Sequence, residues 1–303
     1  MSVSLAMRKP GMSHNKLFIW VGSIVWMAMM VCMSSTLAQV ATSRSESAIH
    51  VLVTASGGRG AVAKEDLTAT LDSQPAQILN LDPARGQPLV FAILLDISGS
   101  SQLEEPFERQ SALDLFRTLA VGSNIAYFGD FNDEVYLSHK PASTDAVLKE
   151  LKAIGRFRGG TALRDAVLEA AKLVSKSAQG VGNRRAVFVI SDGEDNASKL
   201  GLKQVIPELQ HEGVPIFCIG LLGQGPRKKV VAELGTLSEA TGGVARFLTH
   251  PEKFIPSLSS DIENQYWLTL APPAAPDGKL HSLSLTTTPG HLRMIAPTAV
   301  LIQ

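Results

Sequence analysis

Five oxygen-bearing side chains, widely separated along the chain, are of the types that bind a hard divalent cation. Asp96, Ser98 and Ser100 occupy alternate positions at the end of the apolar run VFAILLDISGS. Thr161 follows a pair of glycines, and Asp192 follows a second apolar run, AVFVIS. Two carboxylates and three hydroxyls, with no His or Cys among them, favour Mg²⁺, with Mn²⁺ or Ca²⁺ as alternatives and water completing the shell.

Buried strands are expected to bring these side chains together. The run from Val90 to Leu95 is apolar at every position, which is typical of a strand buried on both faces. From there, apolar runs alternate with amphipathic runs of helical length. This rhythm predicts an α/β fold with a doubly wound, mainly parallel, Rossmann-like sheet. Because the carboxyl ends of parallel strands share one edge, Asp96, Thr161 and Asp192 are expected to converge there.

The bounds of the expected elements follow from the apolar periodicity and from Gly and Pro breakers. The expected buried strands are 90–95, 124–131, 186–191, 215–222 and 244–248, with a short antiparallel strand at 135–139. The expected helices are 104–120, 144–154, 162–177, 201–212, 229–241 and 252–264.

Short strand-like segments flank this α/β unit on both sides. Residues 48–87 contain three alternating segments, and residues 266–303 contain four more, separated by turns rich in Pro and Gly. Either set alone is too small for a stable sheet. We therefore expect the two sets to meet in one smaller β-domain, with the α/β unit, residues 88–265, inserted between them.

The N-terminal 38 residues have the order of a secretory signal. Basic residues precede an uncharged run, Leu17 to Met33, and small residues follow up to Ala38, after which cleavage is expected. The apolar run is also just long enough for an uncleaved membrane anchor, and this alternative stays open. Either way, the body of the protein is expected to be exported, and to be periplasmic, cell-surface or secreted.

The composition narrows the class of partner. The chain has 303 residues, of which 45% are hydrophobic and 18% are charged, so it can bury a large core. Its formal net charge is zero and it has no long basic or acidic run, so nothing favours nucleic acid as a partner. Of two cysteines, Cys32 lies in the N-terminal apolar segment, so no disulfide with Cys218 is expected in a cleaved chain.

The three motifs together resemble a von Willebrand factor A domain, and the flanking strands resemble those of its bacterial relatives. The residues that carry the resemblance are DISGS, Gly160-Thr161 and Ser191-Asp192-Gly193, in the order of the family's metal-ion-dependent adhesion site. The resemblance covers roughly residues 88–264. It implies that Ser98, Ser100 and Thr161 bind the metal directly, that Asp96 and Asp192 act largely through water, and that a partner's Asp or Glu carboxylate fills an open position.

The expected function is therefore protein binding, as an adhesion or scaffolding protein, and not catalysis. Arg156, Arg158 and Glu194 lie near the motifs in the sequence and are candidates for contacting the acidic partner. The chain lacks the GxSxG, GxxxxGK[ST] and GxGxxG motifs, and a hydroxyl-rich site offers no positioned general base. The alternatives are a structural scaffold without a functional metal and a metal-dependent hydrolase.

Overall fold

A computed structural model describes residues 48–56, 62–179, 183–221, 228–248, 254–272, 276–288 and 293–303. The predicted signal or anchor, residues 1–38, lies outside these ranges, as does Cys32, whereas Cys218 is a buried free thiol. Within the described ranges, no helix combines the length and the apolar character needed to cross a bilayer.

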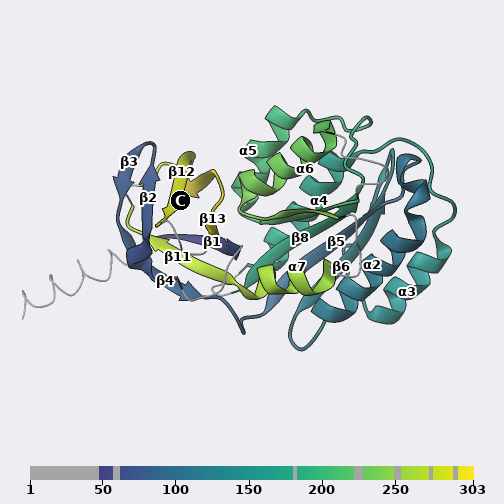
Figure 1. Ribbon diagram of the computed structural model, residues 1–303, viewed down its shortest axis with the longest axis horizontal. Helices are drawn as coiled ribbons and strands as arrows, with labels where there is room; N and C mark the ends of the chain where they lie inside the picture. The colour runs from purple at the N-terminus through teal and green to yellow at the C-terminus, as the bar shows by residue number, and fades with distance from the viewer. Residues whose placement is uncertain are drawn as a thin grey trace, which may run out of the picture. The chain divides into compact units, whose positions relative to one another are not determined.

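The central sheet has the strand order β10-β9-β8-β5-β6-β7 in the described part of the chain (Figure 1). All neighbours pair in parallel except β7, which is antiparallel to β6. The strands are β5 (Leu89–Asp96), β6 (Ile125–Phe131), β7 (Val135–Leu137), β8 (Arg184–Ser191), β9 (Ile216–Leu221) and β10 (Ala245–Leu248).

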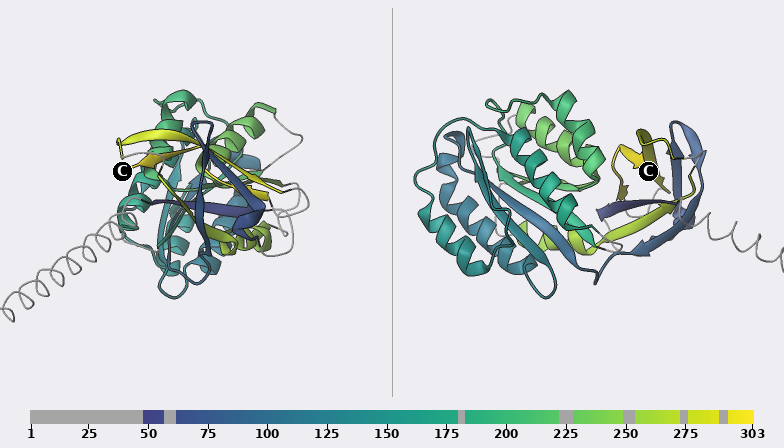
Figure 2. Two further views of the ribbon diagram at one scale, coloured as in Figure 1. Left: turned by 90° about the vertical axis from the view of Figure 1, so that its left-hand side faces the viewer. Right: turned by 180° about the vertical axis from the view of Figure 1, so that it is seen from behind.

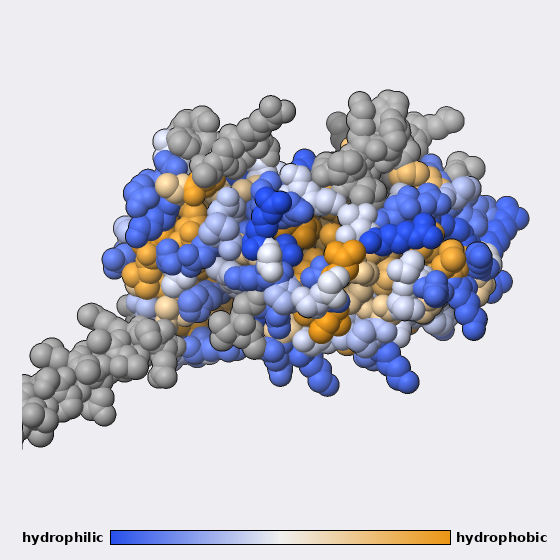
Figure 3. Space-filling model, turned by 90° about the horizontal axis from the view of Figure 1, so that it is seen from below, coloured by the Kyte–Doolittle hydropathy of each residue, from blue (hydrophilic) through white to orange (hydrophobic). Residues whose placement is uncertain are grey.

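Helices cover both faces of this sheet, as Figures 1 and 2 show. On one face lie α2 (Glu105–Leu119), α3 (Thr144–Ala153) and α7 (Phe254–Glu263), and on the other lie α4 (Leu163–Ser177), α5 (Leu202–Glu212) and α6 (Lys228–Thr241). Seen from below, the surface carries hydrophilic residues with smaller hydrophobic patches between them (Figure 3). This distribution fits amphipathic helices whose apolar stripes face the sheet.

Strand β5 explains why the sheet forms around this segment. All eight of its residues are buried, and alternate side chains enter the two cores: Phe91 and Ile93 on the α2 side, Ala92 and Leu94 on the α4 side. The chain leaves β5 toward β6 and later returns on its other side as β8. A reversal of strand order of this kind places ligand sites at the carboxyl ends of the strands.

The strands before and after the α/β unit combine in two antiparallel sheets, so the predicted fold class is confirmed. One sheet has the order β13-β1-β11-β4 and the other β14-β12-β2-β3. Each mixes N-terminal strands, β1 (Ile49–Ser56), β2 (Leu67–Leu71), β3 (Gln74–Ala76) and β4 (Ile78–Pro83), with C-terminal strands, β11 (Gln265–Leu270), β12 (Lys279–Thr287), β13 (Arg293–Ile295) and β14 (Ala299–Ile302). A shared apolar core, including Val53, Ala69 and Leu268, explains why neither set stands alone.

The observed bounds differ from the expected ones by one or two residues at most helix and strand ends. The larger difference is β3, which the sequence did not predict. Asp72 and Ser73 have positive φ values of 47° and 65°, and Leu71 pairs with Gln74, so these two residues form a tight hairpin turn. An Asp-Ser pair is a weak signal for such a turn, and Pro75 argues against a strand.

Candidate functional site

Asp96, the last residue of β5, is completely buried and its carboxylate is held from two sides. Its Oδ1 accepts a hydrogen bond from the Ser98 backbone N–H at 2.9 Å, and its Oδ2 accepts one from Ser191 Oγ at 2.5 Å. Since Ser191 ends β8, the strand next to β5, the pairing of the two strands fixes the orientation of the carboxylate.

The hydroxyls of Ser98 and Ser100 lie side by side in the loop that follows. Their Oγ atoms are 3.1 Å apart. The loop is held by its backbone: Ile97 N–H donates to the carbonyl of Phe131 on β6, and Gly99 N–H donates to the carbonyl of Gly159. The second bond connects this loop directly to the segment that carries Thr161.

Thr161 is completely buried and its backbone is fixed on both sides. Its N–H donates to Asn196 Oδ1 at 2.9 Å, and its carbonyl accepts from the N–H groups of Asn196 and Ala197. Its Oγ1 has no hydrogen-bond partner among the described residues. A buried hydroxyl without a partner is uncommon in native proteins, and an oxygen in this state is suited to bind a cation.

The two glycines before Thr161 let the chain approach the loop after β6. Gly160 N–H donates to Asp133 Oδ1 at 2.7 Å, and Gly159 has a φ of +87°. A Cβ atom on either glycine would overlap the Asp133 side chain. The two glycines are therefore required by the geometry of this loop.

Asp192 follows β8 and is also buried. Its Oδ1 accepts from the Glu194 N–H at 3.2 Å, while Gly193 N–H donates to Ser191 Oγ at 2.8 Å. All five predicted residues thus lie at one edge of the sheet, on loops that are hydrogen-bonded to one another.

The electrostatics of this edge favour a cation. Burial raises the pKa of Asp96 to about 7; hydrogen bonds from Ser191 and Ser98 oppose the rise, and the charge of Asp192 adds to it. Within the described ranges, Asp96 makes no ion pair with Lys, Arg or His. A buried carboxylate without a counter-charge is costly, and a divalent cation would supply that charge.

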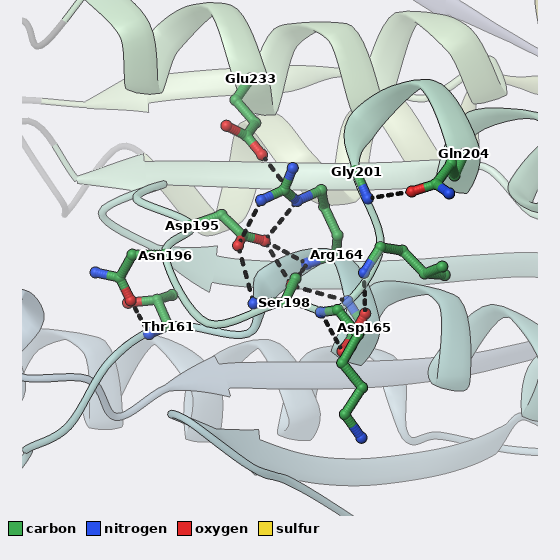
Figure 4. A network of polar contacts seen from close by, with 11 residues as sticks. Thr161, Arg164, Asp165, Asp195, Asn196, Ser198, Gly201, Gln204 and Glu233 are labelled. Atoms are coloured by element: carbon green, nitrogen blue, oxygen red, sulfur yellow. Dashed lines mark hydrogen bonds and ion pairs between the residues drawn. The ribbon is translucent and has the colours of Figure 1, made fainter.

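A salt-bridge network fixes the two loops that carry Thr161 and Asp192 (Figure 4). Arg164 on α4 donates through Nε and Nη2 to the two oxygens of Asp195, at 2.8 and 2.7 Å. Ser198 Oγ donates to the same carboxylate at 2.7 Å, and Glu233 on α6 lies 3.5 Å from Arg164 Nε. The positions of the two loops are therefore coupled through buried charged groups.

The candidates for partner contact lie on the same loops. Arg156 and Arg158 are exposed on either side of the buried Phe157, and Arg158 N–H donates to the carbonyl of Ile97 beside the site. Glu194 is half-buried next to Asp192. Their role toward a partner stays a prediction.

Several residues at this edge were missed by the sequence analysis. Asn196 and Asp133 hold the Thr161 loop, and Ser191 orients Asp96. In the sequence, Ser191 is only one residue of the Ser-Asp-Gly motif, and nothing there indicates this role. Glu108 on α2 is a completely buried acid whose pKa is raised well above its ordinary value by burial, and further by Asp96 and Asp192. A helical wheel would have found Glu108, because an acid there falls on the apolar stripe of the helix.

The donor set fits a small hard cation. In the part of the chain that the structure describes, no three His, Cys, Asp or Glu side chains are grouped closely enough to hold a metal by themselves. Any cation here would therefore depend on the hydroxyls of Ser98, Ser100 and Thr161. Their orphaned or mutually bonded state, beside two buried carboxyls, is compatible with Mg²⁺ and unsuited to a soft metal.

Comparison with solved structures finds partial similarities to three proteins. One is a von Willebrand factor type A protein from Catenulispora acidiphila, with 13% sequence identity and a TM-score of 0.46; the match covers 84% of this chain and 73% of that chain. Another is an aerotolerance-related membrane protein from Bacteroides fragilis, with 16% identity and a TM-score of 0.46; the match covers 58% of this chain and 98% of that chain. The third is BatB from Bacteroides thetaiotaomicron, with 17% identity and a TM-score of 0.42; the match covers 58% of this chain and 97% of that chain. No curated protein matches the sequence.

The sequence itself matches a family model over more than half of its length. The model describes the von Willebrand factor type A domain and matches residues 92–261, which span the chain from β5 to α7 and include all five site residues. The chain therefore belongs to the von Willebrand factor type A domain family.

Proposed function

We propose that this chain is an exported, metal-dependent protein-binding protein, with an adhesion or scaffolding role, whose site holds Mg²⁺ and ligates an acidic residue of a partner. The observation that carries the proposal is the Thr161 hydroxyl, buried without a partner among the described residues, at the same sheet edge as the Ser98–Ser100 hydroxyl pair. Ser98, Ser100 and Thr161 would bind the ion, and Asp96 and Asp192 would orient the hydroxyls and act through water.

Charge favours an acidic ligand. The carboxylates of Asp96 and Asp192 together balance one divalent ion, so an incoming Asp or Glu is attracted to the open side of the cation. Exposed Arg156 and Arg158 on the adjacent loop would add to that attraction. The site has hydroxyls where a hydrolase needs a positioned base, so binding is favoured over catalysis.

Thermal unfolding with and without cation tests the metal site. A cation at a hundred times its Kd should stabilise the wild-type protein by about 2.7 kcal/mol. Thr161→Val, which removes one hydroxyl at nearly constant volume, and Asp96→Ala should both lose this gain. Thr118→Val, which removes an exposed hydroxyl on α2, should keep it.

The outcomes separate the alternatives. No stabilisation of the wild-type protein by Mg²⁺ or Mn²⁺ would favour a scaffold without a functional metal. Turnover of a phosphoester that is lost in Asp96→Ala would favour a hydrolase. For the partner, a pull-down from envelope extract should capture a protein with Mg²⁺ present, and neither with chelator nor with the Thr161→Ala variant.

A further inference from the structure

A cavity of about 380 Å³ lies at the amino edge of the central sheet, the edge opposite the candidate cation site. Its walls form where β5 and β8 begin and where α2 and α7 end, together with the connecting residues 85–88 and 121–124. Because β5 and β8 are parallel, their first residues lie together at the edge away from Asp96 and Asp192. The volume is within the range of pockets that hold small molecules.

Arg184, the first residue of β8, places a buried positive charge in the wall of this cavity. The residue is only 8% exposed. Its Nε donates to the carbonyl of Gln87 and its Nη1 donates to the carbonyl of Ile262, each at 3.0 Å. Its Nη2 makes no hydrogen bond within the described ranges, and it is not enclosed by the core. One nitrogen of the guanidinium is therefore available to donate to a bound molecule.

The two carbonyl groups leave the charge of Arg184 without a counter-ion. In the part of the chain that the structure describes, no carboxylate lies within 4.0 Å of the guanidinium. Burial lowers the pKa of Arg184; the charge of Glu263 opposes this fall, but the Glu263 carboxylate is paired with Arg85 at 3.1 Å. A buried charge without a counter-ion is costly, and a ligand with a carboxylate would supply one.

Other groups in the wall narrow the chemistry of that ligand. The Asn124 amide is already used, because its Oδ1 accepts from the Leu89 N–H and its Nδ2 donates to the carbonyl of Leu119, both at 2.8 Å. The Ser259 hydroxyl, by contrast, has no hydrogen-bond partner among the described residues. Val121 is exposed and adds apolar surface to the lining. A cation and apolar surface side by side suit a carboxylate with a short apolar body.

We propose that this cavity is a binding site for a small carboxylate, whose oxygens accept hydrogen bonds from Arg184 Nη2 and whose apolar body lies against Val121. Hydrogen bonds between a guanidinium and a carboxylate are among the strong ones, because both groups are charged. None of the five metal-motif residues lines the cavity. The protein would therefore bind a small acid at one edge of the sheet, independently of the cation at the other.

Titration with sodium butyrate tests this on protein that has been freed of divalent cations by dialysis, so that no carboxylate can bind through a metal. Sodium chloride at the same concentrations controls for ionic strength. In ¹H–¹⁵N spectra, the amides of Gly122 and Arg184 should shift and saturate, whereas those of Ser98 and Ser100 should not. These shifts give the Kd for butyrate.

Arg184→Met removes the donor and should raise the Kd for butyrate about 10–100 times. Arg117→Met is the matched control, since Arg117 is a half-exposed arginine of α2 that does not line the cavity, and the Kd should change less than twofold. Val121→Glu and Val121→Gln form a second pair at an exposed position, for the case that Arg184→Met does not fold. The Glu variant should have a Kd about two to five times that of the Gln variant, because only Glu repels a carboxylate.

Absence of saturable shifts in the wild-type protein would overturn the inference. Equal affinities of the wild-type protein and Arg184→Met, or of the two Val121 variants, would do the same. Binding of inorganic phosphate without binding of butyrate would contradict the assignment of a carboxylate ligand. Because these titrations contain no divalent cation, none of their outcomes bears on the proposed function.

Discussion

Two groups of buried acids lie at the same edge of the central sheet, and they differ in how their charge is compensated within the described ranges. Asp195 has a fully buried side chain that receives hydrogen bonds from Arg164 and Ser198. Burial alone would raise the pKa of Asp195, but the hydrogen bonds from Arg164 and Ser198 outweigh it and the pKa is lowered. For Asp96 and Glu108, burial dominates and the pKa of both is raised.

The two groups differ in how their buried carboxylates are neutralised. The guanidinium of Arg164 makes two hydrogen bonds to the Asp195 carboxylate and neutralises it. This ion pair holds the two loops in place. Asp96 and Glu108, by contrast, make no ion pair with a basic side chain in the part of the chain that the structure describes. We infer that the first cluster holds the loops and that the second is left for an external cation to complete.

The largest effect on stability is expected when the positive charge of Arg164 is removed. Arg164→Met would leave Asp195 buried without its partner and should lower the free energy of unfolding by about 3–5 kcal/mol, as measured by urea denaturation. Arg117→Met is the control, since Arg117 and Asp114 are 3.9 Å apart with both side chains about half exposed. That change should cost at most about 1 kcal/mol. Equal losses in the two variants would contradict the assignment of the Arg164 cluster as a buried support.

The position of these residues at one edge of the sheet was predictable, because most of them directly follow apolar strands. Asp96, Ser98 and Ser100 are contiguous with a buried apolar strand, and parallel pairing then places Asp192, just after the neighbouring strand, at the same edge. The contacts of Asn196 and Asp133 with the Thr161 loop were not predictable, since they join residues 27 and 35 positions apart through loop conformations. Loop geometry of this kind has no periodic signal.

Charged residues inside the core were missed for a different reason. Glu108 and Arg164 stand in helices that are otherwise ordinary amphipathic segments, and a pattern of apolar residues describes where a helix packs without revealing a charge in its buried stripe. Their functions depend on what the facing loops present. The sequence predicts the sheet and its carboxyl edge well, and predicts poorly how the acids of that edge are neutralised.

Asp130 on β6 lies between the two groups, because a nearby arginine compensates its burial only in part. Burial raises its pKa from 3.8 to about 6, and the charge of Arg109 opposes the rise only in part. Arg109 is already bonded to Glu105 and to the carbonyls of Ile154 and Gly155. The folded protein therefore keeps the Asp130 proton to a higher pH than the unfolded chain does.

It follows that the free energy of unfolding contributed by this group falls as the pH rises from about 4 to about 6. The change should be on the order of 2 kcal/mol. Urea denaturation of the chelator-treated protein across this range should show the decline. Asp130→Asn should reduce the decline, and an unchanged slope in that variant would assign the pH dependence to other groups.

The smallest effect is expected in the β-domain, where the chain supplies a half-buried His281 together with two exposed acids, Asp72 and Asp277. The ring of His281 lies 2.6 Å from Asp72 and 3.0 Å from Asp277. Hydrogen bonds to Asp277 and Asp72 raise the pKa of His281, and its hydrogen bonds lower the pKa of both acids.

The directions of these pKa shifts predict a pH range in which the cluster contributes most to stability. The contribution of His281 is complete below 6.5 and is lost as the pH rises through its raised pKa, whereas that of the acids is complete above 3.8 and is lost on acidification. Stability from this cluster should therefore be greatest between these two values. Chemical shifts of the His281 ring should give a pKa above 6.5 that falls in Asp277→Asn. Because the cluster needs no external cation, the pKa should be the same with Mg²⁺ and with chelator; a shift caused by the metal would show that the two regions are coupled.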